Sequence, residues 1–193
     1  MNFVSDLDFV LVDYEGMTDS FVHLGFYYTY HMVSSSLIKA VAALQTTYPT
    51  ASILVTGHSL GAALATHAAV DIKRKLNPST NMTFYSYGSP RVGNAVFADY
   101  VMTLFPNGTY QRVSHYTDGA VHMPLSEMGF KHAGDEVWYF NEGETLGYKL
   151  CQNGVGEPEN DECANSNYSL FDEGSHWIYL GHKIAGMCTS HQR

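Results

Sequence analysis

Basic residues are scarce in this sequence. Its 193 residues include ten Lys and Arg against nineteen Asp and Glu, which gives a net charge of −9 at pH 7. Nucleic-acid binding draws most of its affinity from basic residues on phosphates, and anchoring on anionic lipid needs a basic patch. The charge balance therefore argues against both kinds of partner. Long apolar runs are missing too: none approaches the roughly 18 residues of a membrane-spanning helix, so no transmembrane segment is expected.

Internal repeats and low-complexity tracts are also missing. The composition is 45% hydrophobic and 15% charged, which is typical of a globular rather than a disordered chain. A chain of this length buries roughly 70% of its unfolded surface on folding. We therefore expect one domain over residues 1–193.

Cysteine is rare, and the odd count of Cys151, Cys163 and Cys188 leaves one cysteine unexplained. The cysteines lack a C-x-x-C spacing and the histidines lack H-E-x-x-H. A zinc site is therefore not expected, and nothing in the sequence calls for an organic cofactor.

Signals of secretion are mixed. No basic region precedes an apolar one at the start of the chain, so no signal peptide is recognised. Asn-X-Ser/Thr sequons nevertheless occur at Asn81, Asn107 and Asn167, which is typical of extracellular proteins.

The spacing of apolar residues predicts three helices. The first has an apolar face formed by Phe26, Tyr30, Val33, Leu37, Val41 and Leu44. The second spans 60–76, and its expected stripe consists of Leu60, Leu64, Ala68, Ile72 and Leu76. The third is expected over 93–105.

Runs rich in β-branched and aromatic residues predict strands between these helices, at 51–56, 82–88, 109–116 and 136–140. The first of them, ASILVT, would suit a strand buried on both faces. Residues 3–14 are expected to form one or two extended pieces, 141–175 a long loop, and 176–183 could form a final helix. Strands alternating with helices indicate an α/β fold with a mostly parallel sheet and helices on both faces.

Ser59 lies in GHSLG, between a predicted strand and a predicted helix. This G-x-S-x-G context is the one that a nucleophile elbow requires, because the tight turn leaves little room for side chains and exposes the Ser59 Oγ. The same turn directs the N–H of Leu60 toward the site as an oxyanion donor. An ordinary serine in a glycine-rich turn is the alternative.

A serine nucleophile needs a base and an acid, which on this fold follow it in the order acid, then His. Asp118 lies just past the third of these strands, although Asp-Gly is also a common turn pair. Of the ten histidines, His23, His31 and His67 precede any candidate acid, and His58 is locked inside the elbow. The residues alone leave the base open among the other six, which are His115, His122, His132, His176, His182 and His191. His176 has only a modest lead, because it opens a segment after the long loop, near the C-terminus.

Several motifs, taken in order, resemble the class 3 lipases of filamentous fungi, a branch of the α/β-hydrolases that also contains feruloyl esterases. They are DLDF with VHLGFYYTY, VTGHSLGAALA, YGSPRVGN, RVSHYTDGAVHMP, GFKHAGDEVWYF and SHWIYLG. The resemblance covers nearly the whole chain. It implies a triad of Ser59, Asp118 and His176, and it selects His176 from the competing histidines.

The sequence departs from the family at its start. In the family, a strand that ends in Phe-Arg-Gly precedes the segment matched by MNFVSDLDF. The Ser or Thr that follows this Phe-Arg-Gly supplies a second oxyanion donor. The resemblance therefore implies an N-terminally incomplete domain that lacks its first strands, one oxyanion donor and part of the lid, and we expect residues 1–193 alone to be a poor catalyst. It also implies a disulfide between Cys151 and Cys163, and a partner for Cys188 in the family's N-terminal segment.

We interpret the sequence as a secreted carboxylester hydrolase, foremost a monomeric triacylglycerol lipase that acts on lipid or ester substrates at an oil–water interface without a metal or organic cofactor. A feruloyl esterase acting on plant cell-wall esters is one alternative. A folded fragment without activity is another.

Overall fold

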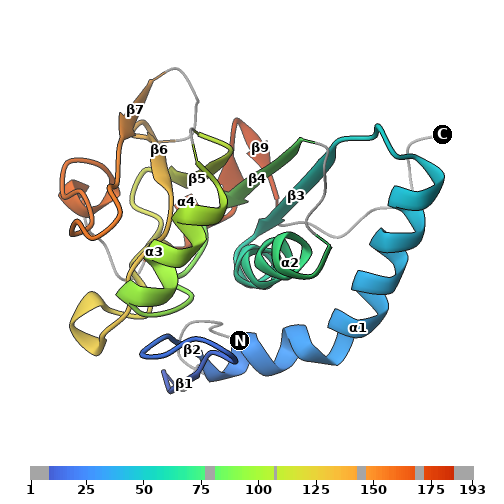
Figure 1. Ribbon diagram of the computed structural model, residues 1–193. Coiled ribbons are helices and arrows are strands. Elements are labelled where there is room, and N and C mark those ends of the chain that lie inside the picture. Colours follow the sequence, from blue (N-terminus) through green and yellow to red (C-terminus); the bar gives the residue numbers. More distant parts are fainter. Residues whose placement is uncertain (1–8, 77–80, 107, 143–146, 168–171, 185–193) are drawn as a thin grey trace, which may run out of the picture.

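A five-stranded sheet forms the centre of the protein. The computed structural model describes residues 9–76, 81–106, 108–142, 147–167 and 172–184 (Figure 1). The strand order is β3-β4-β5-β6-β7, in which the first four strands are parallel and β7 is antiparallel to β6. The strands are β3 (Ile53–His58), β4 (Met82–Tyr87), β5 (Tyr110–His115), β6 (Asp135–Tyr139) and β7 (Tyr148–Cys151). The predicted mostly parallel sheet is confirmed.

Helix α2 lies in the middle of the helical layer. The helices are α1 (Leu24–Thr47), α2 (Leu60–Leu76), α3 (Ala95–Leu104) and α4 (Glu173–His176). Figure 1 shows α2 between α1 and α3, in front of the sheet. The predicted bounds of α2 are confirmed, but its single stripe is wrong. Because the sheet, α1 and α3 enclose this helix, residues on several sides are buried, among them Ala62, Ala63, Thr66, His67 and Val70.

The predicted apolar face of α1 is also partly wrong. Val33 and Leu44 are more than half exposed, whereas Ser34 is buried. The buried side of α1 consists of Phe26, Tyr30 and Ser34, continued by the partly buried Ile38 and Val41. Apolar residues occur on both flanks of this helix, so the packing partner α2 decides which flank is buried.

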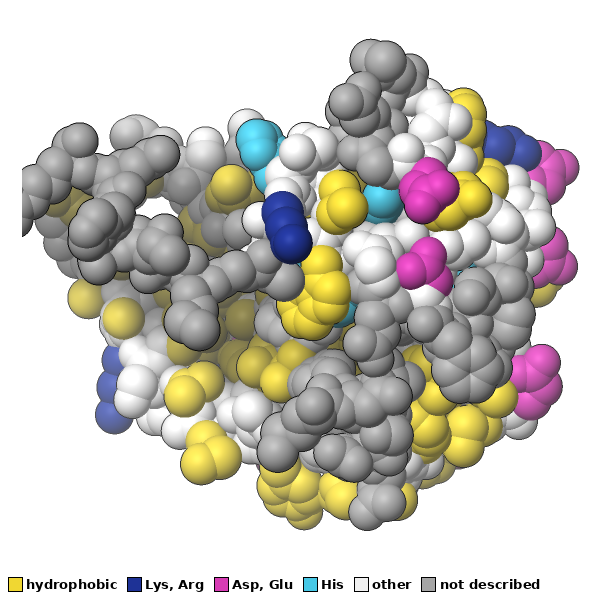
Figure 2. All heavy atoms as spheres, turned by 180° about the vertical axis from the view of Figure 1, so that it is seen from behind, with side chains coloured by type: hydrophobic (Ala, Val, Ile, Leu, Met, Phe, Trp, Pro, Cys, Tyr) yellow, Lys and Arg dark blue, Asp and Glu magenta, His cyan; other side chains and the backbone are white. Residues whose placement is uncertain are grey.

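Among the described residues, the face of the sheet opposite α2 and α3 is less covered than the face on which these helices lie. Leu54 in β3 is 64% exposed, so the expectation that this strand is buried on both faces is wrong. Among the described strands β3 is an edge strand, and the described helices α2 and α3 lie on the other face. Figure 2 looks onto the less covered side, where hydrophobic side chains reach the surface and acidic side chains gather on the half near β7.

Two predictions for the C-terminal third need correction. The expected loop 141–175 contains β7 and a short 3-10 helix, η3 (Ala164–Asn167), and Cys151 at the end of β7 is bonded to Cys163. The expected helix 176–183 is instead a hairpin of β8 (Ile178–Tyr179) and β9 (His182–Lys183). Its turn contains Leu180 and Gly181, both with positive φ, which a helix does not accommodate.

The remaining elements of the structure are short strands and helices. Strand β1 (Leu11–Asp13) pairs with β2 (Phe21–His23), while residues 3–8 of the expected extended start lie outside the described residues, as do Asn107 and Cys188. The helix expected over 93–105 is the shorter α3. Two 3-10 helices, η1 (Gly119–His122) and η2 (Ser126–Met128), follow β5.

Candidate active site

Ser59 occupies a sharp turn between β3 and α2. Its backbone has φ of 57°, a left-handed conformation that is uncommon for a residue with a side chain. The N–H of Ser59 donates to the carbonyl of Tyr87 on the neighbouring strand at 3.0 Å, and its own carbonyl accepts from Ala62 at 2.9 Å. Strain of this kind at the carboxyl edge of the sheet is typical of a nucleophile elbow.

The two glycines of the motif have different roles. A Cβ on Gly57 would lie 2.3 Å from the carbonyl oxygen of Gly61, so only glycine fits at this position. A Cβ on Gly61 would meet no described atom within 4 Å. The expectation that both glycines are there because space is short therefore holds for Gly57 and is wrong for Gly61.

Ser59, His176 and Asp118 form one chain of hydrogen bonds. The His176 Nε2 lies 2.8 Å from the Ser59 Oγ, and the Nδ1 lies 2.9 and 3.0 Å from the two carboxylate oxygens of Asp118. Because a carboxylate can only accept, Nδ1 carries the proton of the neutral ring, and Nε2 is left to accept the Ser59 hydroxyl proton. This arrangement can move a proton from serine to histidine and stabilise the imidazolium that results.

Asp118 is enclosed completely, with 0% of its surface exposed. Besides the His176 ring, it accepts hydrogen bonds from the Ala120 N–H at 2.9 Å and from the Tyr179 hydroxyl at 2.5 Å. Burial, and then the nearby negative charge of Asp118, raise the pKa of Tyr179 well above its usual value. Tyr179 therefore stays protonated and remains a donor. A buried carboxylate with several donors is held in one position.

The other histidines are engaged elsewhere. His122 and His132 are buried, and burial lowers the pKa of His122 to about 4 and that of His132 well below its usual value. His182 is exposed on β9, and His191 lies outside the described residues. Among the described residues only His176 places a ring nitrogen within hydrogen-bond distance of the Ser59 Oγ.

The segment that carries His176 is fixed by polar contacts. Asp172 caps α4 by accepting from the N–H groups of Gly174 and Ser175, at 2.9 and 3.2 Å. Burial raises the pKa of Asp172, but hydrogen bonds from the hydroxyls of Ser175 and Thr117, and then from these N–H groups, lower it overall. A nitrogen of the His115 ring lies 3.0 Å from the carbonyl oxygen of Ser175. His176 is therefore positioned from two sides.

Gly88 lies against the triad, with φ of 54°. A Cβ at this position would lie 2.8 Å from the Tyr179 hydroxyl, 2.9 Å from the Asp118 Oδ2 and 3.2 Å from the His176 Nδ1. Our sequence reasoning gave no role to Gly88, Tyr179 or Asp172. Their motifs, YGSP and H-x-x-Y-x-G, were the only signals that could have identified the first two.

Leu60, the expected oxyanion donor, is the first residue of α2. The N–H groups in the first turn of a helix have no acceptor within the helix, and the positive end of the helix dipole lies there. This N–H is therefore available to an anion beside Ser59. We identify no second donor among the described residues.

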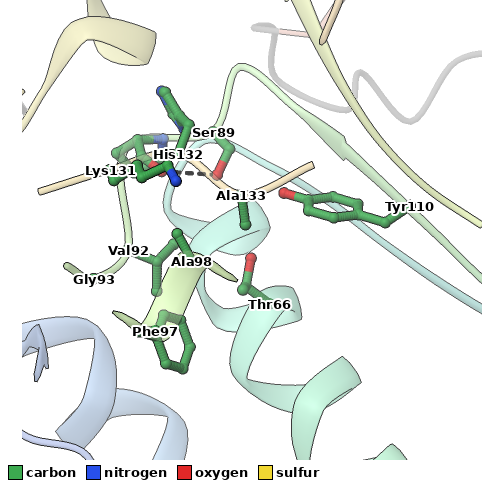
Figure 3. Close-up of a pocket in the computed structure, with 11 residues that line it drawn as sticks. Thr66, Ser89, Val92, Gly93, Phe97, Ala98, Tyr110, Lys131, His132 and Ala133 are labelled. Atoms are coloured by element: carbon green, nitrogen blue, oxygen red, sulfur yellow. Dashed lines mark hydrogen bonds between the residues drawn. The ribbon is translucent and has the colours of Figure 1, made fainter. Parts of the chain in front are cut away.

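A small cavity lies away from the triad, between α2, α3 and the segments 89–93 and 131–133 (Figure 3). It holds about 10 Å³, which is room for about one water molecule, so it is too small for a substrate. Among the described residues no group of three or more His, Cys, Asp or Glu could hold a metal ion. No helix in the described part of the chain is long and apolar enough to cross a membrane.

Comparisons with known proteins agree with this geometry. Residues 1–128, more than half of the chain, match the family model described as lipase (class 3). The chain is 35% identical to a lipase of Rhizomucor miehei over 192 residues, which covers 97% of this chain and 50% of the relative. It is 38% identical to the secreted mono- and diacylglycerol lipase A of Penicillium cyclopium over 138 residues, or 71% of this chain and 43% of that protein.

Solved structures give the same result for the fold. A triacylglycerol lipase whose catalytic centre is described as a serine protease triad superposes with a TM-score of 0.83 at 32% identity, covering 95% of this chain and 68% of that one. The α/β-hydrolase fold is thereby confirmed. The chain spans about half the length of the curated relatives it matches.

Proposed function

The chain belongs to the class 3 lipase family, and we propose that it is a serine carboxylester hydrolase acting on lipid esters, with residues 1–193 part of a single hydrolase domain. The observation that carries the proposal is the unbroken hydrogen-bond chain from the Ser59 Oγ through His176 to Asp118. A serine hydroxyl becomes a useful nucleophile when a neighbouring base takes its proton, and this geometry supplies that base.

The proposed reaction has two halves. The Ser59 Oγ attacks the ester carbonyl carbon while its proton moves to the His176 Nε2, and the Leu60 N–H binds the oxyanion. The intermediate then collapses, the leaving alcohol takes the proton from His176, and an acyl-enzyme remains. Water repeats the sequence on the acyl-enzyme and releases the carboxylic acid. Asp118 holds the ring in the tautomer that this requires and stabilises its charged form.

We further propose a secreted, monomeric triacylglycerol lipase that works at an oil–water interface. A relative from Penicillium cyclopium is described as secreted, and the Cys151–Cys163 disulfide suits an oxidising compartment. Asn81 is exposed at the start of β4 and Asn167 is half-buried at the end of η3, so of these two Asn81 is the better glycosylation candidate. Asn107 also remains a candidate.

The test compares wild type with Ser59→Ala, in a full-length version of the protein, on p-nitrophenyl butyrate and on emulsified triacylglycerol. We expect Ser59→Ala and His176→Ala each to lower kcat by about 10⁴-fold or more. Ser35→Ala, an exposed serine on α1, should behave as wild type. A phosphonate ester should modify Ser59, as read by peptide mass mapping. Hydrolysis that survives Ser59→Ala would refute the proposal.

A further inference from the structure

His58 precedes Ser59 in the elbow, and its side chain reaches the residue that supplies the base. The His58 Nε2 lies 2.9 Å from the backbone carbonyl oxygen of His176. The rings of His58 and His176 are 4.6 Å apart, centroid to centroid, at an interplanar angle of 36°. His176 is therefore joined to the elbow twice, by its side chain to Ser59 and by its backbone to His58.

We propose that His58 is a positioning residue for the base, a brace that fixes the distance between the Ser59 Oγ and the His176 Nε2. The proposal rests on the proposed function, since it assigns no separate chemistry to His58. The carbonyl of His176 can only accept, so the His58 Nε2 must carry a hydrogen and donate it.

The position of His58 in the chain makes this contact effective. His58 and Ser59 are neighbours on a turn whose backbone is fixed by the Ser59 N–H donating to Tyr87. A hydrogen bond from His58 to the His176 carbonyl therefore fixes the position of the base relative to the neighbouring nucleophile. Other polar contacts of the four-residue helix α4 and its cap come from residues such as His115, Thr117 and Asp172, none of which belongs to the elbow.

The ring of His58 also has to remain uncharged while His176 becomes an imidazolium. Groups facing it are His176, Tyr179 at 5.3 Å between ring centroids, Asp118 behind His176, and Tyr87, its register neighbour on β4. Burial, followed by the charge of protonated His176, lowers the pKa of His58; the hydrogen bond to the His176 carbonyl and the Asp118 carboxylate oppose this with smaller effects. A neutral Nε2–H ring therefore braces the base without adding a second positive charge beside it.

Three substitutions separate the brace from simple packing. His58→Phe keeps a ring of similar size but has no donor. His58→Gln carries an amide nitrogen at about the reach of the imidazole Nε2, whereas the amide of His58→Asn is too short to reach the carbonyl. We expect His58→Phe and His58→Asn to lower kcat by about tenfold to a hundredfold on a soluble short-chain ester, with KM changed less than about twofold. His58→Gln should recover most of the loss.

The matched control is His182→Phe, an exposed histidine in the same hairpin as Tyr179, which should leave kcat unchanged. A double-mutant cycle distinguishes positioning of the base from a purely structural role of His58. In a His176→Ala background the brace has no base to position, so adding His58→Phe should cause no further loss. The rate at which a p-nitrophenyl phosphonate modifies Ser59, followed by mass spectrometry, gives the same comparison without turnover.

Two results would overturn the proposal. One is a wild-type kcat for both His58→Phe and His58→Asn. The other is an equal fold-loss from His58→Phe with and without His176, which would mean that His58 acts through packing alone. Either result leaves hydrolysis dependent on Ser59. Failure of the proposed function is different, because hydrolysis would then survive Ser59→Ala.

Discussion

Replacing Gly88 by alanine should disable the site with little effect on the fold. The added methyl group would lie 2.8 Å from the Tyr179 hydroxyl and 2.9 Å from the Asp118 Oδ2, closer than carbon and oxygen normally approach. Neither neighbour has room to retreat, since Asp118 is 0% and Tyr179 3% exposed. The added methyl group must therefore displace Asp118 and distort its hydrogen bond with His176.

The size of the effect follows from these contacts. A misplacement of about 1 Å in a catalytic group can lower activity about 10²-fold, and loss of the function of the triad aspartate lowers kcat about 10⁴-fold. We expect kcat/KM of Gly88→Ala to fall between these limits. The positive φ of 54° should also lower the free energy of unfolding by about 1–2 kcal/mol.

Gly156→Ala is the matched control for the backbone. Gly156 has φ of 80°, and a Cβ there would meet no described atom within 4 Å. Its free energy of unfolding, measured by urea titration, should fall by a similar amount. Its hydrolysis of p-nitrophenyl butyrate should stay at the wild-type rate. If Gly88→Ala keeps more than about a tenth of the wild-type kcat/KM, the methyl group does not disturb the triad and the reasoning fails.

Three further outcomes are expected. Tyr179→Phe should lower kcat about tenfold or less, because Asp118 keeps its other donors, while circular dichroism stays unchanged; a loss equal to that of Asp118→Ala would contradict this. Cys151→Ser should lower the free energy of unfolding by about 3 kcal/mol, because the bond to Cys163 closes a loop with a sequence separation of 12, and urea titration measures it. Burial lowers the pKa of His67 to about 3, so below pH 6.5 the unfolded chain binds more protons than the folded one. The free energy of unfolding should therefore fall by about 2 kcal/mol from pH 7.5 to 5. His67→Phe should flatten this part of the plot of unfolding free energy against pH.

The turn at Ser59, the proposed nucleophile, could be predicted because its signal is local. A tight strand-to-helix turn imposes glycine at position 57 and places the half-buried Ser59 at its tip, and the G-x-S pattern shows both features in the sequence. Helix α2 was predicted to its end residues for the same reason. The apolar flank of α1 could not be predicted, because the choice between Val33 and Ser34 depends on where α2 lies. Strand β7 lacks a local signal of its own and forms by pairing with β6.

His176, the proposed base, was harder to identify than Ser59. Spacing and chain order gave His176 only a modest lead, and the resemblance to a family decided the choice. The polar groups around it form no pattern in the sequence: His58 lies inside the elbow, and His115 is one more rival for the base. Their partners are backbone carbonyls far away in the chain, which no local pattern reveals.

The position of the base is imposed from outside its own segment. Residues 172–184 form a four-residue helix and a hairpin of two-residue strands, and an isolated helix needs roughly 12–15 residues to be even marginally stable in water. His176 is therefore fixed by hydrogen bonds that its segment donates to Asp172 and accepts from the rings of His115 and His58. Because each of them contributes only about 1 kcal/mol to stability, substitutions at these positions should impair hydrolysis well before they unfold the protein.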